Sequence, residues 1–255
     1  MLVVGFDTET SGLDPKTANI LEVGAVLFDV DSSFNWNYVE GFSNLIFEQY
    51  NLPIPEAASA VNGITEEALR TKGIGFLEGL AKFSRLANQA SYIVAHNAPY
   101  DKTVLESQLA RLGISSGIPS MKWLCSVMDL ESNKDKKCWK LAHMALDYGV
   151  TVNPTNLHTA LADVRLMGEM LSAAKADPEA MWRYKNTPIA ILSTPVCPPW
   201  DDNGKDRDLA KAAGYGWEEV RSVGKKYAKR WVKGIKHTPD NLAKEVREYE
   251  ILEII

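Results

Sequence analysis

The chain begins with a stretch that predicts a buried strand with a charged end, Leu2-Val3-Val4-Gly5-Phe6-Asp7-Thr8-Glu9-Thr10. Side chains alternate along a strand with a period of two, so Asp7 and Glu9 project from the same face. Two carboxylates this close repel each other unless a cation lies between them. Hard divalent ions such as Mg²⁺ bind to one or two carboxylates together with substrate phosphate oxygens. The stretch therefore suggests a metal site for phosphoryl chemistry, although D-x-E is also common as a plain polar strand end.

A second segment predicts a short strand, Ser91–Ala95, that runs into His96-Asn97-Ala98-Pro99-Tyr100-Asp101. Pro99 suits the first turn of a helix, where its missing N–H costs nothing, and Asp101 then lies in that first turn. On this segment alone, Asp101 is also compatible with a charge that favours a helix N-terminus. His96 and Asn97 are likewise compatible with an ordinary hydrogen-bonded loop.

A third segment contains His158 and Asp163 and predicts a helix, because its apolar residues follow helical spacing: Leu157, Leu161, Val164, Met167 and Leu171. Asn156 or Thr155 is the expected N-cap. Residues five apart on an ideal helix are separated by roughly 140°. His158 and Asp163 can therefore converge only if His158 lies on the entering turn. Taken singly, His158 also fits a satisfied histidine near a helix start.

In this order, D-x-E, H-N-x-x-x-D and H-x-A-x-x-D resemble the motifs of the DnaQ-like 3′→5′ exonucleases, in the subgroup called DEDDh. The resemblance covers roughly residues 1–175. It implies an α/β, ribonuclease H-like fold, in which a mixed five-stranded sheet is flanked by helices. Val61-Asn62-Gly63-Ile64 is a further likeness, although many relatives carry a histidine at the position of Asn62.

The resemblance also implies a catalytic site with two metal ions, Mg²⁺ or Mn²⁺. The implied metal ligands are Asp7, Glu9, Asp101 and Asp163, with Asp101 reaching a metal through water, and the implied general base is His158. Contacts to the terminal nucleotide are implied for Thr8, Thr10, Asn62, His96 and Asn97. Leu13 is either a wedge against a base or a plain core residue.

We therefore expect a metal-dependent 3′→5′ exonuclease that hydrolyses single-stranded nucleic acid to 5′-mononucleotides. Its expected partners are the 3′ ends of single-stranded DNA, with RNA as the alternative. A catalytically silent nucleic-acid-binding protein on the same fold is a further alternative. Such a protein should have lost one of the five catalytic residues, and all five are present.

The bulk properties are those of an ordinary globular protein. The 255 residues carry a net charge of −5, which is not typical of a general nucleic-acid coat protein. The three cysteines form no C-x-x-C, no apolar run reaches the length of a membrane span, and no signal-peptide pattern precedes Asp7. These features predict a cytoplasmic protein without a membrane partner, in the host cytoplasm if a phage encodes it.

The expected domains are the exonuclease domain at 1–176, a Pro-rich linker at 177–206 and a small α+β module at 207–255. In the first domain we expect strands at 20–28, 38–47, 91–95 and 123–128 after the opening one. The module contains seven Lys or Arg residues between Arg221 and His237, interleaved with Tyr227 and Trp231. This run fits either a surface that binds single-stranded nucleic acid or a solvated basic face with two core aromatics.

Overall fold

The computed structural model describes residues 1–133, 138–153, 159–194, 207–212, 214–221, 227–238, 241–242 and 250–254. The chain divides into two compact units, Met1–Lys185 and Asn186–Ile255.

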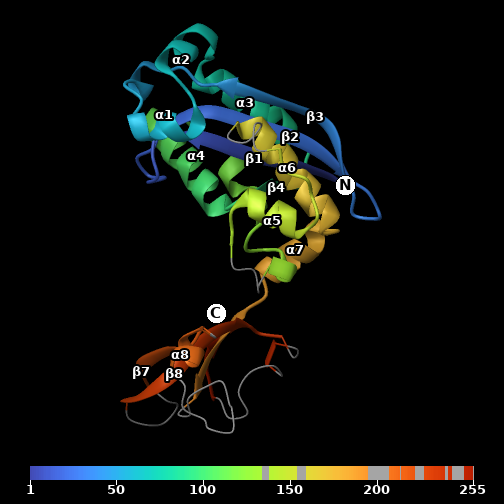
Figure 1. Ribbon diagram of the computed structural model, residues 1–255, viewed down its shortest axis with the longest axis vertical. Helices are drawn as coiled ribbons and strands as arrows, with labels where there is room; N and C mark the ends of the chain where they lie inside the picture. Colours follow the sequence, from blue (N-terminus) through green and yellow to red (C-terminus); the bar gives the residue numbers. More distant parts are fainter. Residues whose placement is uncertain are drawn as a thin grey trace. The chain divides into compact units, whose positions relative to one another are not determined.

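A mixed five-stranded sheet forms the centre of the first unit (Figure 1). Its strands are β1 (Leu2–Thr10), β2 (Ile20–Val30), β3 (Trp36–Leu45), β4 (Tyr92–Ala95) and β5 (Trp123–Cys125), in the order β3-β2-β1-β4-β5. The first three strands are antiparallel, whereas β4 runs parallel to β1 and β5 runs parallel to β4. This arrangement confirms the ribonuclease H-like sheet expected from the sequence. Because β1 is the central strand, its apolar run is buried on both faces.

Helices cover both faces of the sheet (Figure 1). The helices of this unit are α1 (Glu56–Asn62), α2 (Glu66–Lys72), α3 (Phe76–Ala87), α4 (Ala98–Leu112), α5 (Leu141–Asp147), α6 (Ala160–Ala173) and α7 (Pro178–Lys185). Helices α3 and α4 contribute to one hydrophobic cluster, and α5 and α6 to another. The sheet is therefore the middle layer of three.

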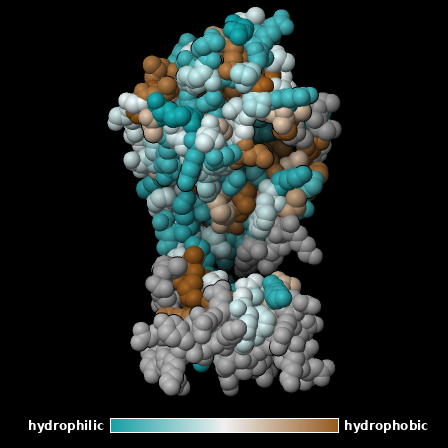
Figure 2. Space-filling view, turned by 90° about the vertical axis from the view of Figure 1, so that its left-hand side faces the viewer, coloured by the Kyte–Doolittle hydropathy of each residue, from teal (hydrophilic) through white to brown (hydrophobic). Residues whose placement is uncertain are grey.

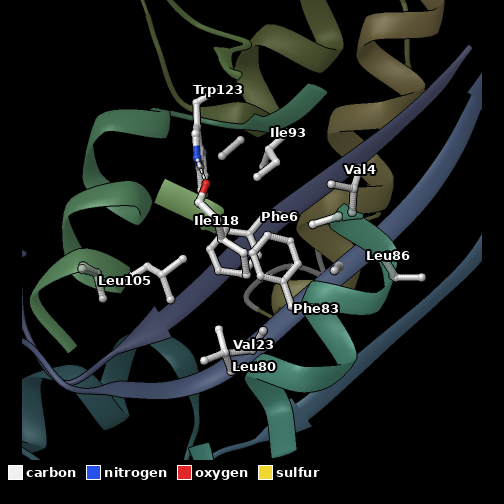
Figure 3. Close-up of a cluster of buried hydrophobic side chains, with 14 of the residues drawn as sticks. Val4, Phe6, Val23, Leu80, Phe83, Leu86, Ile93, Leu105, Ile118 and Trp123 are labelled. Carbon is white, nitrogen blue, oxygen red and sulfur yellow. Dashed lines mark hydrogen bonds between the residues drawn. The ribbon is translucent and has the colours of Figure 1, made fainter. Parts of the chain in front are cut away.

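The first cluster, drawn in Figure 3, joins β1 to α3 and α4. Phe6 stacks on Phe83 with ring centroids 4.2 Å apart and meets Trp123 edge-on at 5.8 Å. Aromatic pairs in these geometries contribute beyond the area that they bury. This packing fixes β1 against α3 and beside β5.

On the other face, α6 packs against β1 and β2 at unusually short range. A Cβ atom added at Gly24 would lie 2.5 Å from the backbone carbonyl carbon of Ala160, and one added at Gly5 would lie 2.5 Å from Val164 Cγ1. Glycine at both positions therefore lets the helix approach the strands closely. The consequence is that the first turn of α6 lies directly over the sheet.

Two local boundaries differ from expectation. Helix α6 begins at Ala160, and its N-cap is Thr159, whose hydroxyl oxygen accepts a hydrogen bond from Ala162 N–H at 3.4 Å. The expected caps at 155 and 156 lie outside the described residues. Strand β5 ends at Cys125 rather than at 128, because the Asp129 carboxylate accepts a hydrogen bond from Cys125 N–H at 2.7 Å and turns the chain.

The stretch 177–206 differs from the extended linker that its prolines predict. Its first part forms α7, in which Pro178 occupies the start of the helix, where proline is tolerated. Lys185 Nζ then anchors the end of α7 by donating to the Trp123 carbonyl at 2.6 Å. The next part forms β6 (Ile189–Thr194), an inner strand of the second sheet. Residues 195–206 lie outside the described part of the chain.

The second unit is built on a four-stranded antiparallel sheet in the order β7-β8-β6-β9. Besides β6, its elements are α8 (Arg207–Ala212), β7 (Gly216–Arg221), β8 (Tyr227–Lys236) and β9 (Glu250–Ile254). The basic run of the sequence thus forms mainly strand β8. Within it, Trp231 is buried and packs on the half-exposed Trp217 with ring centroids 5.2 Å apart. The side chain of Tyr227 lies outside the described set.

Among the described helices, none is both long and apolar enough to cross a membrane. Figure 2 shows that hydrophilic side chains cover much of one face of the first unit, with smaller hydrophobic groups between them.

Candidate active site

Three carboxylates meet at the end of β1. Asp7 and Glu9 project from the face of β1 that α6 covers, and Asp163 lies in the first turn of α6. Each offers one oxygen, and these three atoms all lie within 4.8 Å of one another. The structure therefore brings together the first and third motifs, which are more than 150 residues apart in the sequence.

Asp101 reaches the same strand end from the opposite face, in the first turn of α4. Its carboxylate is buried, and Oδ1 accepts hydrogen bonds from Thr8 N–H at 3.1 Å and from the Thr8 hydroxyl at 2.8 Å. It is not a member of the three-carboxylate group. Its charge nevertheless raises the pKa of Asp7. Asp101 is thus held beside the group by Thr8.

Burial and mutual repulsion raise the pKa values of these acids. Burial contributes most to the raised pKa of Asp7, followed by Asp101, Asp163, Glu9 and Glu22. The pKa of Glu9 is raised to about 7, mainly by burial and then by the charges of Asp163, Glu22 and Asp101. Burial also raises the pKa of Asp101 to about 7, against the hydrogen bonds from Thr8. Deprotonating several buried carboxyl groups this close together is unfavourable. A bound divalent cation offsets this cost, and carboxylate oxygens are the ligands that hard cations prefer.

A fifth acid, Glu22 of β2, belongs to this charge cluster and was missed by the sequence analysis. It lies directly across the β1–β2 ladder from Glu9 and is only 8% exposed. One carboxylate oxygen accepts from the Ser43 hydroxyl, and the other accepts from Ala160 N–H at 3.2 Å. A lone acid inside the apolar strand Ile20–Phe28 was the available signal, because buried charges are rare without partners.

The residues expected near the substrate lie around the same strand end. Thr10 and Tyr100 both hydrogen-bond to the Gly12 carbonyl, at 2.9 and 2.6 Å. Asn62 donates to the Thr10 carbonyl at 3.4 Å. Leu13 is 94% exposed, which excludes the core alternative for this residue. Its side chain is accessible to a ligand.

Both ring nitrogens of His96 are used within the chain. Nε2 lies 2.7 Å from the Trp139 carbonyl, which can only accept, so Nε2 carries the hydrogen. Nδ1 then accepts from the Ser126 hydroxyl at 2.8 Å. Burial lowers the pKa of His96, which favours this neutral form. The next residue, Asn97, is exposed and adopts a left-handed backbone with φ 62° at the start of α4.

Comparison with known proteins identifies the family. The RNase_T family model, described as an exonuclease, matches residues 4–171. The chain belongs to this family of DnaQ-like exonucleases. It is 31% identical over 170 residues to DNA polymerase III subunit epsilon of Treponema pallidum, covering 66% of this chain and 73% of that protein. It is 32% identical over 181 residues to a DNA polymerase III subunit epsilon-like protein of Rhodobacter capsulatus, of which it spans 24%.

Solved structures share the fold of this exonuclease. Exonuclease X in complex with 5′ overhanging duplex DNA superposes with a TM-score of 0.55 at 21% identity, over 72% of this chain and 99% of that one. The zinc-bound form of an E. coli exonuclease I complex with single-stranded DNA superposes with a TM-score of 0.57 at 18% identity, over 76% of this chain and 47% of that one. At these identities the likeness shows the fold alone.

The acidic motif residues of this exonuclease gather at the end of β1. The structure brings Asp7, Glu9 and Asp163 together and holds Asp101 beside them. His158 lies outside the described residues, immediately before the N-cap of α6 in the sequence. The divalent-metal chemistry typical of this family fits the acidic cluster.

Proposed function

We propose that this exonuclease removes 5′-mononucleotides from the 3′ ends of single-stranded DNA, with two Mg²⁺ or Mn²⁺ ions in its site. The observation that carries the proposal is the group of three carboxylate oxygens within 4.8 Å, from Asp7, Glu9 and Asp163. Three carboxylates clustered this closely repel one another and are suited to cations. The scissile phosphate would then lie at the open end of β1.

Asp7, Glu9 and Asp163 would hold the ions, and Asp101 would contribute from the other face. When bound, a pair of divalent ions supplies an activated nucleophile and stabilises charge on both the attacking and leaving oxygens. Thr8 keeps the Asp101 carboxylate oriented through two hydrogen bonds to Oδ1. We assign His158 the proton transfer from the attacking water, because a histidine pKa near neutrality suits a general base.

The substrate end would lie over the turn that follows β1. The exposed Leu13 is placed to pack against a base, and Asn62 and Thr10 border the same turn. DNA is favoured as substrate because the relative of 31% identity is a subunit of a DNA polymerase. RNA is the alternative, and contact to a 2′-hydroxyl would distinguish the two.

The test compares 5′-labelled and 3′-labelled single strands of matched DNA and RNA sequence, incubated with Mg²⁺, Mn²⁺ or EDTA. We expect a ladder of shortening 5′-labelled DNA and immediate release of labelled mononucleotide from 3′-labelled DNA, both abolished by EDTA. Faster loss of RNA would favour the exoribonuclease alternative. No degradation of either strand with any metal would favour a silent binding protein, and internal cuts would exclude an exonuclease.

Variants sharpen this test. Asp163→Asn removes one member of the carboxylate group, and His158→Ala removes the assigned base. Glu40→Gln is the matched control, because Glu40 is a partly exposed acid of β3 that pairs with Arg85 and is not a member of the carboxylate group. We expect the first two variants to lose activity and the control to keep it.

A further inference from the structure

A pocket opens near the start of α4, where Asn97 is one of its lining residues. Its volume is about 510 Å³, within the range of roughly 300–1,000 Å³ that small-molecule sites occupy. It is lined by apolar and aromatic side chains with two amides: Val127, Met128, Leu130, Trp139, Tyr184, Asn97 and Asn133.

The lining selects a class of ligand. The seven described lining side chains carry no charge, so they offer no ion pair to a phosphate group. Two flat aromatic rings, a thioether and two amide groups instead match a planar ligand with polar edges. Among the parts of a nucleic acid, the base has these properties.

Two large apolar side chains of the pocket are left exposed. Trp139 is 46% exposed and Met128 is 50% exposed. Exposed apolar groups that gather at a pocket are typical of a binding site. They offer a surface on which a base could stack.

Hydrogen bonds of His96 and the position of Asn97 connect the pocket to the start of α4. His96 holds the Trp139 carbonyl at 2.7 Å through Nε2, and Ser126 fixes the other side of the imidazole. Asn97 lines the pocket and immediately precedes α4, whose first turn carries Asp101. Its left-handed backbone is uncommon outside glycine and is often found at functional sites.

We propose that this pocket binds one unpaired nucleobase of the substrate strand, stacked on Trp139, and that His96 acts as a positioning residue for that ring. This inference rests on the proposed function for its ligand, since the strand must reach the carboxylate cluster.

The test measures binding of 5′-labelled single strands by fluorescence anisotropy, with Mg²⁺ and with full-length protein that carries Asp7→Asn to prevent hydrolysis. One strand is intact, and four others each have a single abasic site at one of the four 3′-terminal positions. We expect one abasic position to weaken binding roughly 5- to 150-fold, the range for loss of a stacked base. With Trp139→Ala added, the intact strand should bind equally weakly, and that abasic position should cause no further loss.

Trp139→Phe keeps a flat ring and should restore part of the affinity. Tyr38→Ala is the matched control, because Tyr38 is an exposed aromatic of β3 outside the pocket, and it should bind like the parent. A titration with free deoxynucleoside monophosphates shows whether the pocket takes the base from a strand or from the released product.

The proposal is overturned if Trp139→Ala binds the intact strand as the parent does. It is also overturned if the abasic penalty is unchanged when Trp139 is replaced. Persisting hydrolysis in the Asp7→Asn protein would instead contradict the proposed metal site, while the comparison of intact and abasic strands would still report on the pocket.

Discussion

The Glu22 carboxylate accepts a hydrogen bond from Ala160 N–H at 3.2 Å, and this bond ties the start of α6 to strand β2. Asp163 lies one turn further along that helix and is a member of the carboxylate group. Glu22 is therefore placed to set the position of Asp163.

Two substitutions of Glu22 separate its role in positioning the start of α6 from the effect of its charge. Glu22→Gln keeps an oxygen that can accept from Ala160 N–H, whereas Glu22→Ala leaves this N–H without its acceptor. We expect Glu22→Ala to lower the free energy of unfolding by about 1–3 kcal/mol and to raise the Mg²⁺ concentration that gives half-maximal activity. Glu22→Gln should be closer to wild type in both respects. Equal behaviour of the two variants in chemical denaturation and in Mg²⁺ titration would contradict a positioning role.

Gly24 is the second contact between β2 and the start of α6. In Gly24→Ala the new Cβ would lie 2.5 Å from a backbone atom of Ala160, which cannot move aside as a side chain end can. We expect a loss of about 1–3 kcal/mol in the free energy of unfolding. Gly117→Ala is the control, because its Cβ would meet no heavy atom within 4 Å. If thermal denaturation shows equal stability for Gly24→Ala and Gly117→Ala, the close approach of α6 to β2 is contradicted.

Thr8 tests the orientation of Asp101. Thr8→Val keeps the shape of the side chain but removes the hydroxyl that donates to Asp101 Oδ1 at 2.8 Å. We expect a loss of about 1 kcal/mol in stability, as for a typical buried hydrogen bond, and reduced activity. Thr8→Ser retains the donor and should recover both. If Thr8→Val is as active and as stable as wild type, this hydrogen bond does not hold Asp101 in place.

The raised pKa values predict that the metal-free protein loses stability as pH rises. Glu9 and Asp101 titrate near pH 7 in the folded protein, against about 4 in an unfolded chain. The folded state therefore holds protons that the unfolded state has released, so the contribution present below pH 4 is lost as pH rises through 7. Chemical denaturation in EDTA at pH 5 and pH 8 should show this decrease, and stability that rises over this interval would refute it.

Mg²⁺ should restore the free energy of unfolding that is lost as pH rises, because the bound cation takes the place of the released protons. At 100 times its dissociation constant, a ligand of the folded state alone adds about 2.7 kcal/mol at 25 °C. Asp7→Asn should reduce both the loss between pH 5 and pH 8 and the gain with Mg²⁺.

The sequence predicted the sheet, and the common face of Asp7 and Glu9, because both follow local rules. The apolar run before Asp7 predicted a buried strand, and the alternation of side chains placed Asp7 and Glu9 on one face. Asp163 was found through its motif. Glu22 was not, since its partners Ser43 and Ala160 come from a neighbouring strand and a distant helix, and no local pattern indicates them.

The structure within 177–206 was missed for a different reason. Prolines break regular structure inside an element but are tolerated at its start, and Pro178 and Pro188 stand at or before the starts of α7 and β6. The pairing of β6 with β8 and β9 depends on residues 37 or more positions away in sequence. Such long-range pairing cannot be read from composition.

The central claim is that Asp7, Glu9 and Asp163 together hold the metal ions required for hydrolysis. The most direct test is the single-turnover rate of removal of the 3′-terminal nucleotide from single-stranded DNA at saturating Mg²⁺, for wild type and Asp7→Asn. The account predicts a rate at least roughly 100-fold lower for Asp7→Asn, in a protein whose thermal stability without metal is unchanged or higher. A folded Asp7→Asn protein that cleaves at the wild-type rate would contradict the account.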